Sequence, residues 1–474
     1  MARTAAALPA GTRLTDFVSL GVLTARFPIE TVHEVLARTD RASKRERALP
    51  AHVMVYYAIA LALYAEVATR EVLRCLLEGA RWLGDPTRDM APAGRSAISQ
   101  ARTRLGAAPL EALYRTVVAP VATRETPGAW YRDWRVMSLD ATTLDVADTR
   151  ANARAFGRPR SSRGVNRTGA FPQLRLLGLL ENGTHAICAA RLGRYRTSEV
   201  ALARAVLPSL TREMLCLADR GFLSFDLWGA AAATGAALLW RAAAHFTLPV
   251  LERFPDGSYR SELRRHARSR SREHTPIPVR VIADTLPDVP AADAAYRLVT
   301  TILEPARAPA TELATLYRER WEIETAFDEF KTHLKGAQRV LRSKTPELVR
   351  QETWGLLLAH FAIRALMHDA ALGALPRARD PDTLSFTHAV AVTRRTLPHV
   401  TAISPSGPGA APSRARTDSR RSARGSRAPT TGPRRAARGQ AQDDELSAQT
   451  TRPQVHPPRD VPRARPHPKS TKTS

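Results

Sequence analysis

Between residues 134 and 240 the chain alternates short apolar runs with helical segments, and the order of these runs restricts the fold. We expect strands at 136–139, 174–180, 185–191, 214–218 and 236–240, and helices at 198–207 and 222–234. Asn182 and Gly183 mark a hairpin turn between the second and third of these strands. Strands that alternate with helices predict an α/β core for this part of the chain.

The segment before residue 124 has a helical pattern. Apolar residues recur every three or four positions at 29–36, 53–63 and 72–76. This spacing predicts helices that each bury one side, and therefore a helical N-terminal domain.

After residue 243 the pattern changes again. Residues 246–299 alternate short β-like runs with breaks rich in Pro, Gly and Arg, which indicates a β-rich insertion. Helices are expected at 311–334 and 352–367. From residue 401 the chain is mostly Pro, Arg, Ser and Ala, so it buries too little apolar surface to offset its ordering entropy. We expect a disordered tail there.

The charge of the chain indicates a polyanionic partner. Lys and Arg number 71 against 45 Asp and Glu, which gives a net charge of +26. The residues from 401 onward hold 15 of these basic residues and 5 of the acidic ones, so the preceding residues keep +16. The basic character is therefore not only a property of the tail, although charge alone names no chemistry.

The cysteines and the apolar segments indicate the cellular compartment of the protein. Cys75, Cys188 and Cys216 are far apart, in apolar surroundings, and lack the spacing of a disulfide framework or a metal site. The N-terminus has no signal-peptide pattern, and the longest apolar run, residues 53–65, is too short to span a bilayer. We expect a cytoplasmic protein with no membrane partner.

Asp140 and Asp219 each follow a predicted strand directly. Their neighbours Ala141 and Gly221 are small and leave the carboxylates accessible. A single Asp after a strand is usually a helix cap or a turn residue. Functional sites in α/β proteins lie at the carboxyl ends of strands, which is where these two residues are expected. The pair indicates a functional site only if a third residue joins it.

The predicted helix at 311–334 offers that partner. At 100° per residue an apolar stripe faces the core, formed by Leu316, Ile323, Phe327, Phe330 and Leu334. Tyr317, Arg320, Glu324 and Lys331 form a second stripe beside it. A charge run on a helix is usually a solvated face with spaced salt bridges. Here the polar stripe borders the core rather than opposing it, which favours a site.

The residue types suggest which cofactor such a site would take. Three carboxylates without a Cys/His cluster suit Mg²⁺ or Mn²⁺ rather than zinc. Two such ions, roughly 4 Å apart, can activate an attacking oxygen and stabilise a leaving oxygen at phosphorus. Tyr317, Arg320 and Lys331 would then hold phosphate oxygens.

These residues resemble the DDE transposases of bacterial insertion sequences, in particular the insertion sequence four family. The family signature Tyr-x2-Arg-x3-Glu-x6-Lys is matched by Tyr317, Arg320, Glu324 and Lys331. The blocks around Asp140 and Asp219 resemble the two Asp motifs of the family, except that Ala141 stands where relatives often carry Gly. The resemblance runs from about residue 14 to residue 398.

The resemblance implies an architecture. A helical N-terminal domain (1–125) that binds transposon ends would precede a ribonuclease H-like, mixed-sheet catalytic core. The core would comprise residues 126–243 and 306–400, interrupted by the β-rich insertion at 244–305, and the basic tail would follow at 401–474.

The resemblance also implies an activity. Asp140, Asp219 and Glu324 would be the catalytic residues and would hold two Mg²⁺ or Mn²⁺ ions. A homodimer would bind double-stranded DNA at the terminal inverted repeats, cleave it through a hairpin intermediate, and join the freed end to target DNA. Such a protein would be cytoplasmic and associated with the nucleoid. Hairpin-forming relatives stack a flipped base on a Trp, for which Trp240 is the candidate, although a Trp ending an apolar strand is more often a core residue.

A basic block in the N-terminal region resembles the corresponding block of the family. Its candidate DNA contacts are Arg95, Gln100, Arg102 and Arg104. An ordinary exposed basic helix explains these residues equally well.

Two other functions share the same core. After about residue 398 the chain no longer resembles the family, and a tail translated from a shifted reading frame would explain this. The protein would then be a catalytically inactive remnant that binds DNA and has an aberrant C-terminus. A metal-dependent nuclease without a joining step would differ only in its products.

Overall fold

The structure is a computed structural model, and it describes most of the chain up to residue 395. The described residues are 20–45, 49–65, 67–82, 93–159, 170–265, 275–285, 295–336, 339–373 and 379–395. The disordered tail predicted at 401–474 lies outside them.

The N-terminal part is helical, as its apolar spacing predicts. Its helices are α1 (Leu20–Arg26), α2 (Ile29–Arg38), α3 (Ala51–Leu63), α4 (Thr69–Trp82), α5 (Arg95–Leu105) and α6 (Ala108–Val117). Helix α3 is apolar on all sides, and 11 of its 13 residues are buried. It packs against α12 (Pro346–Leu372), so the N-terminal helices share one hydrophobic core with the C-terminal helix.

One mixed sheet runs through the rest of the described chain. Its strands are β1 (Trp130–Tyr131), β2 (Trp134–Asp145), β3 (Gln173–Glu181), β4 (Ala186–Arg194), β5 (Met214–Ala218), β6 (Ala237–Ala242), β7 (Glu252–Arg253), β8 (Tyr259–Leu263), β9 (Ile277–Thr285) and β10 (Ala295–Thr300). The order is β4-β3-β2-β5-β6-β10-β9-β8-β7, with β1 paired to β2. Strands β2, β5 and β6 are parallel, and β3 and β4 are antiparallel to their neighbours. This order confirms the mixed-sheet, ribonuclease H-like α/β core.

The β-rich insertion extends that sheet. Strand β10 pairs with β6, and β9, β8 and β7 follow in antiparallel order. The insertion therefore shares the hydrogen-bonded sheet of the core.

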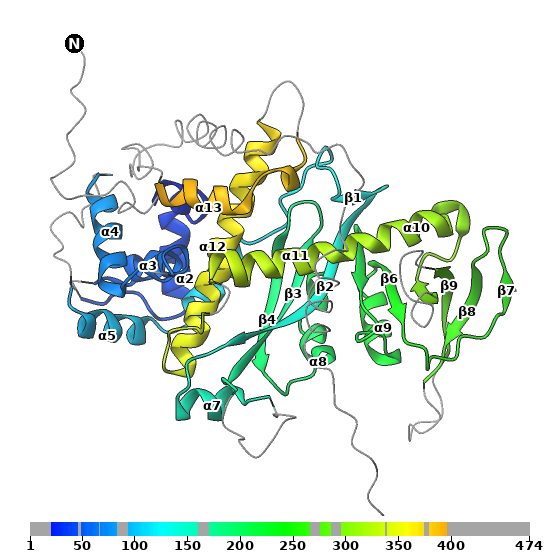
Figure 1. Cartoon of the computed structure of the whole chain (residues 1–474), viewed down its shortest axis with the longest axis horizontal. Helices are drawn as coiled ribbons and strands as arrows, with labels where there is room; N and C mark the ends of the chain where they lie inside the picture. Colours follow the sequence, from blue (N-terminus) through cyan, green and yellow to red (C-terminus); the bar gives the residue numbers. More distant parts are fainter. Residues whose placement is uncertain are drawn as a thin grey trace, which may run out of the picture. The chain divides into compact units, whose positions relative to one another are not determined.

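Helices cover both faces of the central strands (Figure 1). The helical segments that follow the N-terminal part are α7 (Arg150–Phe156), α8 (Glu199–Arg204), η3 (Leu207–Ser209), α9 (Phe225–Ala232), η4 (Pro305–Arg307), α10 (Ala310–Tyr317), η5 (Arg318–Trp321), α11 (Glu322–Asp328), η6 (Glu329–Leu334), α12, η7 (Pro381–Thr383) and α13 (Phe386–Arg395). Helices α8 and α9 pack on one face in one apolar cluster. Helices α10 and α11 pack on the other face in two further clusters. The central strands are thus buried on both sides, which explains their continuous apolar sequences.

The predicted helix at 311–334 is continuous but not uniformly α-helical. Residues 318–321 form a 3₁₀ turn and residues 329–334 form a π-helical turn. Each changes the angle between successive side chains, so a stripe drawn at 100° per residue drifts beyond Asp328. Lys331, at the far end of the predicted second stripe, lies in the π-helical turn.

Helix α12 is long and apolar enough, by length and composition alone, to cross a bilayer. Its residues are nevertheless almost all buried by α3, α6, α13 and β4. Within the described residues it is a core helix.

Candidate active site

The two predicted Asp residues lie side by side because of the register of the parallel strands. Leu139 of β2 pairs with Ala218 of β5, which in turn pairs with Trp240 of β6. The next residues along these strands are Asp140, Asp219 and Arg241. Neighbouring strands are about 4.8 Å apart, so the three residues form one row across the sheet. Strand β2 continues to Asp145, so the expectation that it ends at Asp140 is wrong.

The alternation of the strands sends this row toward helices α10 and α11. Leu139, Ala218 and Trp240 belong to the apolar cluster that α8 and α9 cover. Because successive side chains point to opposite faces, Asp140, Asp219 and Arg241 face the other way. Gly178 of β3 pairs with Asp140, and a Cβ there would meet Ile187 and the ring of Phe327 at 3.2 and 3.4 Å. The glycine thus lets α11 lie close to the sheet beside Asp140.

Three residues of the helical segment reach this row. Arg320 lies between two carboxylates, with Nη1 3.6 Å from Oδ2 of Asp140 and Nη2 donating a hydrogen bond of 3.0 Å to Oε1 of Glu324. The hydroxyl of Tyr317 donates to the carbonyl of Ala218, the residue before Asp219, at 3.2 Å. Predicted residues from three separate segments of the sequence therefore lie near one another.

The electrostatics confirm that these groups act on one another. Burial is the main reason why the pKa of Asp140 is raised to about 6; the N–H of Ala141 and the charge of Arg320 lower it, and Glu324 and Glu199 add to the rise. Burial alone would lower the pKa of Arg320, yet that pKa is raised because acidic groups surround it. These groups are Tyr317, Asp219, Asp140 and Glu324.

The carboxylates remain accessible in spite of the burial around them. The side chain of Asp140 is 23% exposed and that of Glu324 is 42% exposed, whereas Arg320 is only 9% exposed. Carboxylate oxygens that solvent can reach are the donors that hard divalent cations prefer. The residue types present therefore fit a divalent-cation site.

Lys331 does not join the other residues of the signature in this structure. It lies in the π-helical turn, and its charge acts on Lys335. Among the described residues, no hydrogen bond or ion pair connects it with Tyr317, Arg320 or Glu324. The π-helical turn accounts for this difference from the predicted stripe.

Trp240 is not available to stack on a base. It is fully buried, lies on core strand β6 rather than in the insertion, and packs edge-on against Trp228 at 5.2 Å between ring centroids. Strand alternation directs it to the face opposite the carboxylates, which is the physical reason why this expectation is wrong.

The predicted DNA contacts on α5 divide into two groups. Arg95, Gln100 and Arg104 are exposed. Arg102 is buried and donates hydrogen bonds to Gln351 and Ser343, at 2.8 and 3.0 Å. It ties α5 to α12, so its assignment as a DNA contact is wrong. The helical spacing of Arg102 with the buried Ile98 and Leu105 was the available signal.

Two residues near the carboxylates were not predicted from the sequence. Arg241 follows a buried strand just as Asp140 and Asp219 do, and its guanidinium lies 5.4 Å from the ring centroid of Tyr296. It also acts on the pKa of Tyr317. Trp321 is 62% exposed, and the Arg320 guanidinium lies 5.3 Å from its ring. An exposed Trp beside a predicted catalytic residue was a signal that the sequence offered.

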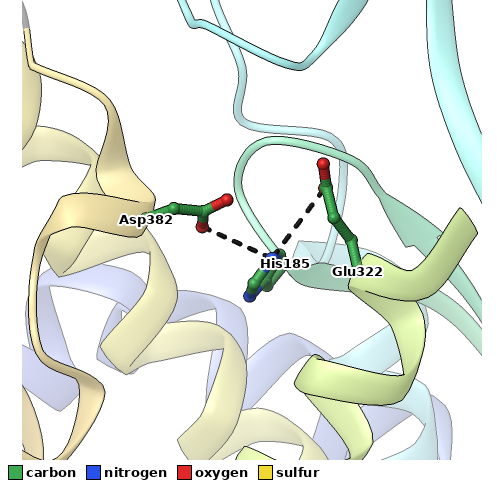
Figure 2. Close-up of side chains that lie close together, drawn as sticks. All are labelled: His185, Glu322 and Asp382. Carbon is green, nitrogen blue, oxygen red and sulfur yellow. Dashed lines mark ion pairs between the residues drawn. The ribbon is translucent and has the colours of Figure 1, made fainter. Parts of the chain in front are cut away.

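The opposite side of α11 carries a second polar cluster, which the sequence did not predict. Nε2 of His185 lies 3.3 Å from Oδ1 of Asp382 and 3.8 Å from Oε2 of Glu322 (Figure 2). Burial raises the pKa of Glu322, and Asp382 raises it further. The ligand-type atoms of these three residues all lie within 4.8 Å of one another.

A buried ion pair lies next to this cluster. Arg364 of α12 forms a two-pronged ion pair with Glu329, and its Nη2 also donates to Nδ1 of His185. Although burial opposes ionisation, Arg364 holds the pKa of Glu329 well below its ordinary value. His360 lies 3.5 Å from the same carboxylate. The cluster and the ion pair are one continuous network.

Comparisons with known proteins agree with the geometry. The model described as insertion element 4 transposase N-terminal matches residues 17–115. The model described as transposase DDE domain matches residues 132–362, which include all the carboxylates of the candidate site.

Individual relatives agree with these families. The chain is 27% identical over 383 residues to the transposase InsG for insertion sequence element IS4 of Escherichia coli (strain K12), covering 79% of this chain and 82% of that protein. It is 29% identical over 201 residues to the putative transposase InsZ of the same organism, covering 42% of this chain and 63% of that one.

A solved structure of the piggyBac transposase synaptic complex with hairpin DNA has a TM-score of 0.43 and 10% identity, covering 89% of this chain and 88% of that one. This likeness is too distant to support an argument.

The two matching models together with the similarity to InsG identify the chain as a member of the insertion sequence four family of DDE transposases.

Proposed function

We propose that this transposase binds the terminal inverted repeats of an insertion sequence, cleaves the DNA there through a hairpin intermediate, and joins the end to target DNA. Asp140, Asp219 and Glu324 act as the catalytic residues. The observation that supports this most is the convergence of these carboxylates, from two strands and one helix, around Arg320.

A DDE transposase domain implies dependence on divalent metal ions. We propose that the three carboxylates hold two Mg²⁺ or Mn²⁺ ions. Such ions supply a deprotonated oxygen nucleophile and charge stabilisation for the leaving oxygen. The accessible oxygens of Asp140 and Glu324 suit this role, because both side chains are partly exposed.

The cations around the carboxylates then bind the DNA strand. Arg320 has a planar fork that fits two phosphate oxygens, and it lies between the carboxylates. Arg241 lies in the same row and provides a second cation. Tyr317 positions the loop of Asp219 through its bond to Ala218. Lys331 retains a part in DNA binding only if the helix repositions around it.

An unpaired base needs an aromatic surface, and Trp321 takes this role in place of Trp240. It is exposed, and it directly follows Arg320. Base stacking on an aromatic side chain contributes about 1–3 kcal/mol. In a hairpin mechanism this contribution would hold one flipped base beside the carboxylates.

The exposed side of α5 is the proposed contact with the transposon end. Arg95, Gln100 and Arg104 lie there, and the chain as a whole carries +26. Two copies would bring two ends together, so the active complex is proposed to be a homodimer in the bacterial cytoplasm, at the nucleoid.

The test is cleavage of a DNA fragment that carries an element end, with Mg²⁺ or Mn²⁺, by the wild type and by Glu324→Gln. Asp328→Asn is the matched control, because Asp328 is also an exposed acid of α11 and lies one turn further on. We expect metal-dependent products with the wild type and the control, including a hairpin end and then a joined product, and none with Glu324→Gln.

Other outcomes decide between the alternatives. Cleavage that survives in Glu324→Gln removes this residue from the mechanism. Binding of end DNA without cleavage by the wild type supports an inactive remnant. Cleavage without a joined product supports a nuclease.

A further inference from the structure

The polar cluster on the far side of α11 joins three separate segments. His185 comes from the turn between β3 and β4, Glu322 from α11, and Asp382 from η7 near the end of the described chain. The ligand-type atoms of these residues all lie within 4.8 Å of one another. Figure 2 shows both carboxylates directed toward the same imidazole.

The imidazole is buried and incompletely bonded. The side chain of His185 is 5% exposed, and its Nε2 atom is inaccessible and makes no hydrogen bond. Buried polar atoms without partners are rare, and a missing ion or water is one of the usual reasons. The free nitrogen lies between the carboxylates of Glu322 and Asp382, so it is directed into the cluster.

The charges around Glu322 also favour a cation. Arg364 pairs with Glu329 and lies 3.9 Å from Asp382. Burial and the charges of Asp382 and Glu319 raise the pKa of Glu322. A partly buried carboxylate whose charged form is disfavoured in this way is stabilised by a cation beside it.

The spacing fits a single ion. Donor atoms that each lie about 2.1 Å from one ion, at a tetrahedral angle, are about 3.4 Å apart. The distances from Nε2 of His185, 3.3 Å to Asp382 and 3.8 Å to Glu322, are close to this value.

We propose that His185, Glu322 and Asp382 bind one Zn²⁺ ion, separate from the proposed catalytic ions. A nitrogen donor with two carboxylates favours a transition metal over Mg²⁺, since imidazole suits zinc and similar ions. The ion compensates the charge of the network and holds α11 to the turn between β3 and β4 and to η7. Glu324 also lies on α11, so the ion holds in place the helix that carries this proposed catalytic residue.

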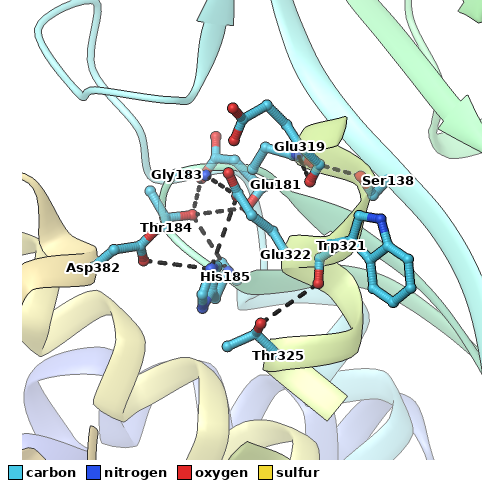
Figure 3. Close-up of polar contacts among 12 residues, drawn as sticks. Ser138, Glu181, Gly183, Thr184, His185, Glu319, Trp321, Glu322, Thr325 and Asp382 are labelled. Atoms are coloured by element: carbon cyan, nitrogen blue, oxygen red, sulfur yellow. Dashed lines mark hydrogen bonds and ion pairs between the residues drawn. The ribbon is translucent and has the colours of Figure 1, made fainter. Parts of the chain in front are cut away.

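The neighbouring groups can adjust to the ion. In the metal-free chain Arg364 donates to Nδ1 of His185, so the neutral ring carries its proton on Nε2. In the zinc-bound chain the proton is on Nδ1, so Nη2 of Arg364 gives up its bond to that nitrogen and keeps its bond to Oε1 of Glu329, which lies 3.5 Å from Nδ1 as the acceptor. Metal-binding histidines commonly donate their second N–H to a carboxylate in this way. Figure 3 shows the same turn, in which the N–H of Gly183 donates to Glu322 and the hydroxyl of Thr184 donates to Glu181.

The test uses full-length protein with Asp140→Asn, Asp219→Asn and Glu324→Gln, which removes the proposed catalytic ligands. After treatment with a chelator, the protein is incubated with Zn²⁺, desalted and analysed for bound metal. We expect one zinc per chain and a higher melting temperature. Adding Asp382→Asn or Glu322→Gln abolishes both effects, whereas adding Asp328→Asn leaves them unchanged.

A second measurement covers the case in which the cluster variants do not fold. Co²⁺ added to the folded parent protein should give visible absorption bands of a nitrogen- and oxygen-ligated ion, and the ring of His185 should change tautomer in ¹⁵N spectra. A parent that retains no metal, or that retains it with an unchanged His185 ring, overturns the proposal. Since this protein lacks the proposed catalytic carboxylates, either result is independent of whether the protein cleaves DNA.

Discussion

The two sides of helix α11 carry acidic clusters of opposite character. Glu324 faces Asp140 and Arg320 at the exposed edge of the sheet, whereas Glu322, two residues earlier, is directed toward the buried imidazole of His185, which Asp382 contacts from the surface. Two residues correspond to about 200° around an α-helix, so one short segment supplies both clusters.

The difference lies in how each cluster compensates its charge. The exposed cluster has Arg320 and solvent as partners, and its carboxylates are free to exchange them for other cations. The other cluster has Arg364 committed to Glu329 and centres on the imidazole of His185, whose side chain is only 5% exposed. An accessible site with loosely held groups suits turnover, and a buried one suits a permanent structural link. The predictions below test this division.

The largest effect is expected from Asp219→Asn. Loss of a proposed metal ligand should reduce DNA cleavage by at least about 10³-fold, or roughly 4 kcal/mol of transition-state stabilisation, without a loss of folding stability. Single-turnover cleavage rates and melting temperatures measure both. Retention of more than a tenth of the wild-type rate would mean that the acids of the exposed cluster do not act as catalytic ligands.

Arg364→Met should have the largest effect on stability. Removing one partner of a buried ion pair costs about 3–5 kcal/mol, because the carboxylate of Glu329 is left buried and unpaired. Arg320→Met should cost less than half as much, since its partners Asp140 and Glu324 reach solvent. Urea denaturation gives both values, and equal losses would remove the distinction between the clusters.

Arg241→Ala should lower the cleavage rate by about 10–100-fold and reduce the salt dependence of DNA binding by about one phosphate contact. Arg241→Lys should retain part of the rate, because it keeps the charge and loses only the planar fork. Binding titrations at several salt concentrations provide the check. An unchanged salt slope in Arg241→Ala would place this residue outside the DNA contact.

The smallest effect is a pH dependence of stability in the metal-free protein. Burial raises the pKa of Asp140 from 3.8 to about 6, so between these values the folded chain holds a proton that the unfolded chain releases. Stability should therefore fall as the pH rises from about 4 to about 6. Asp140→Asn should remove this fall and be more stable above pH 6, on the order of 1–2 kcal/mol. Identical pH profiles would show that Asp140 is not desolvated.

The sequence predicted the parts of the site that depend on local pattern. The strands before Asp140 and Asp219 are short apolar runs, and their positions are confirmed. The position of Arg320 beside Glu324 follows from helical spacing, and it is also confirmed.

The remaining features depend on tertiary contacts that no local pattern encodes. Arg241 enters the row only through the register of β5 with β6. The spacing of Arg102 with Ile98 and Leu105 indicates burial, but the partner Gln351 that buries it lies far away in the chain. The cluster of His185 with Asp382 joins residues separated by almost 200 positions.

The most direct test of the central claim locates the bound ions by iron-mediated cleavage of the protein itself. Fe²⁺ that replaces the bound ions generates radicals, and these cut the backbone close to the metal. In Asp382→Asn, where the proposed zinc site next to Glu324 is removed, our account predicts cuts near Asp140, near Asp219 and near Glu324 in the same molecule, and the loss of all three when Asp219→Asn is added. Cuts near Glu324 that occur without cuts near Asp140 and Asp219 would contradict it.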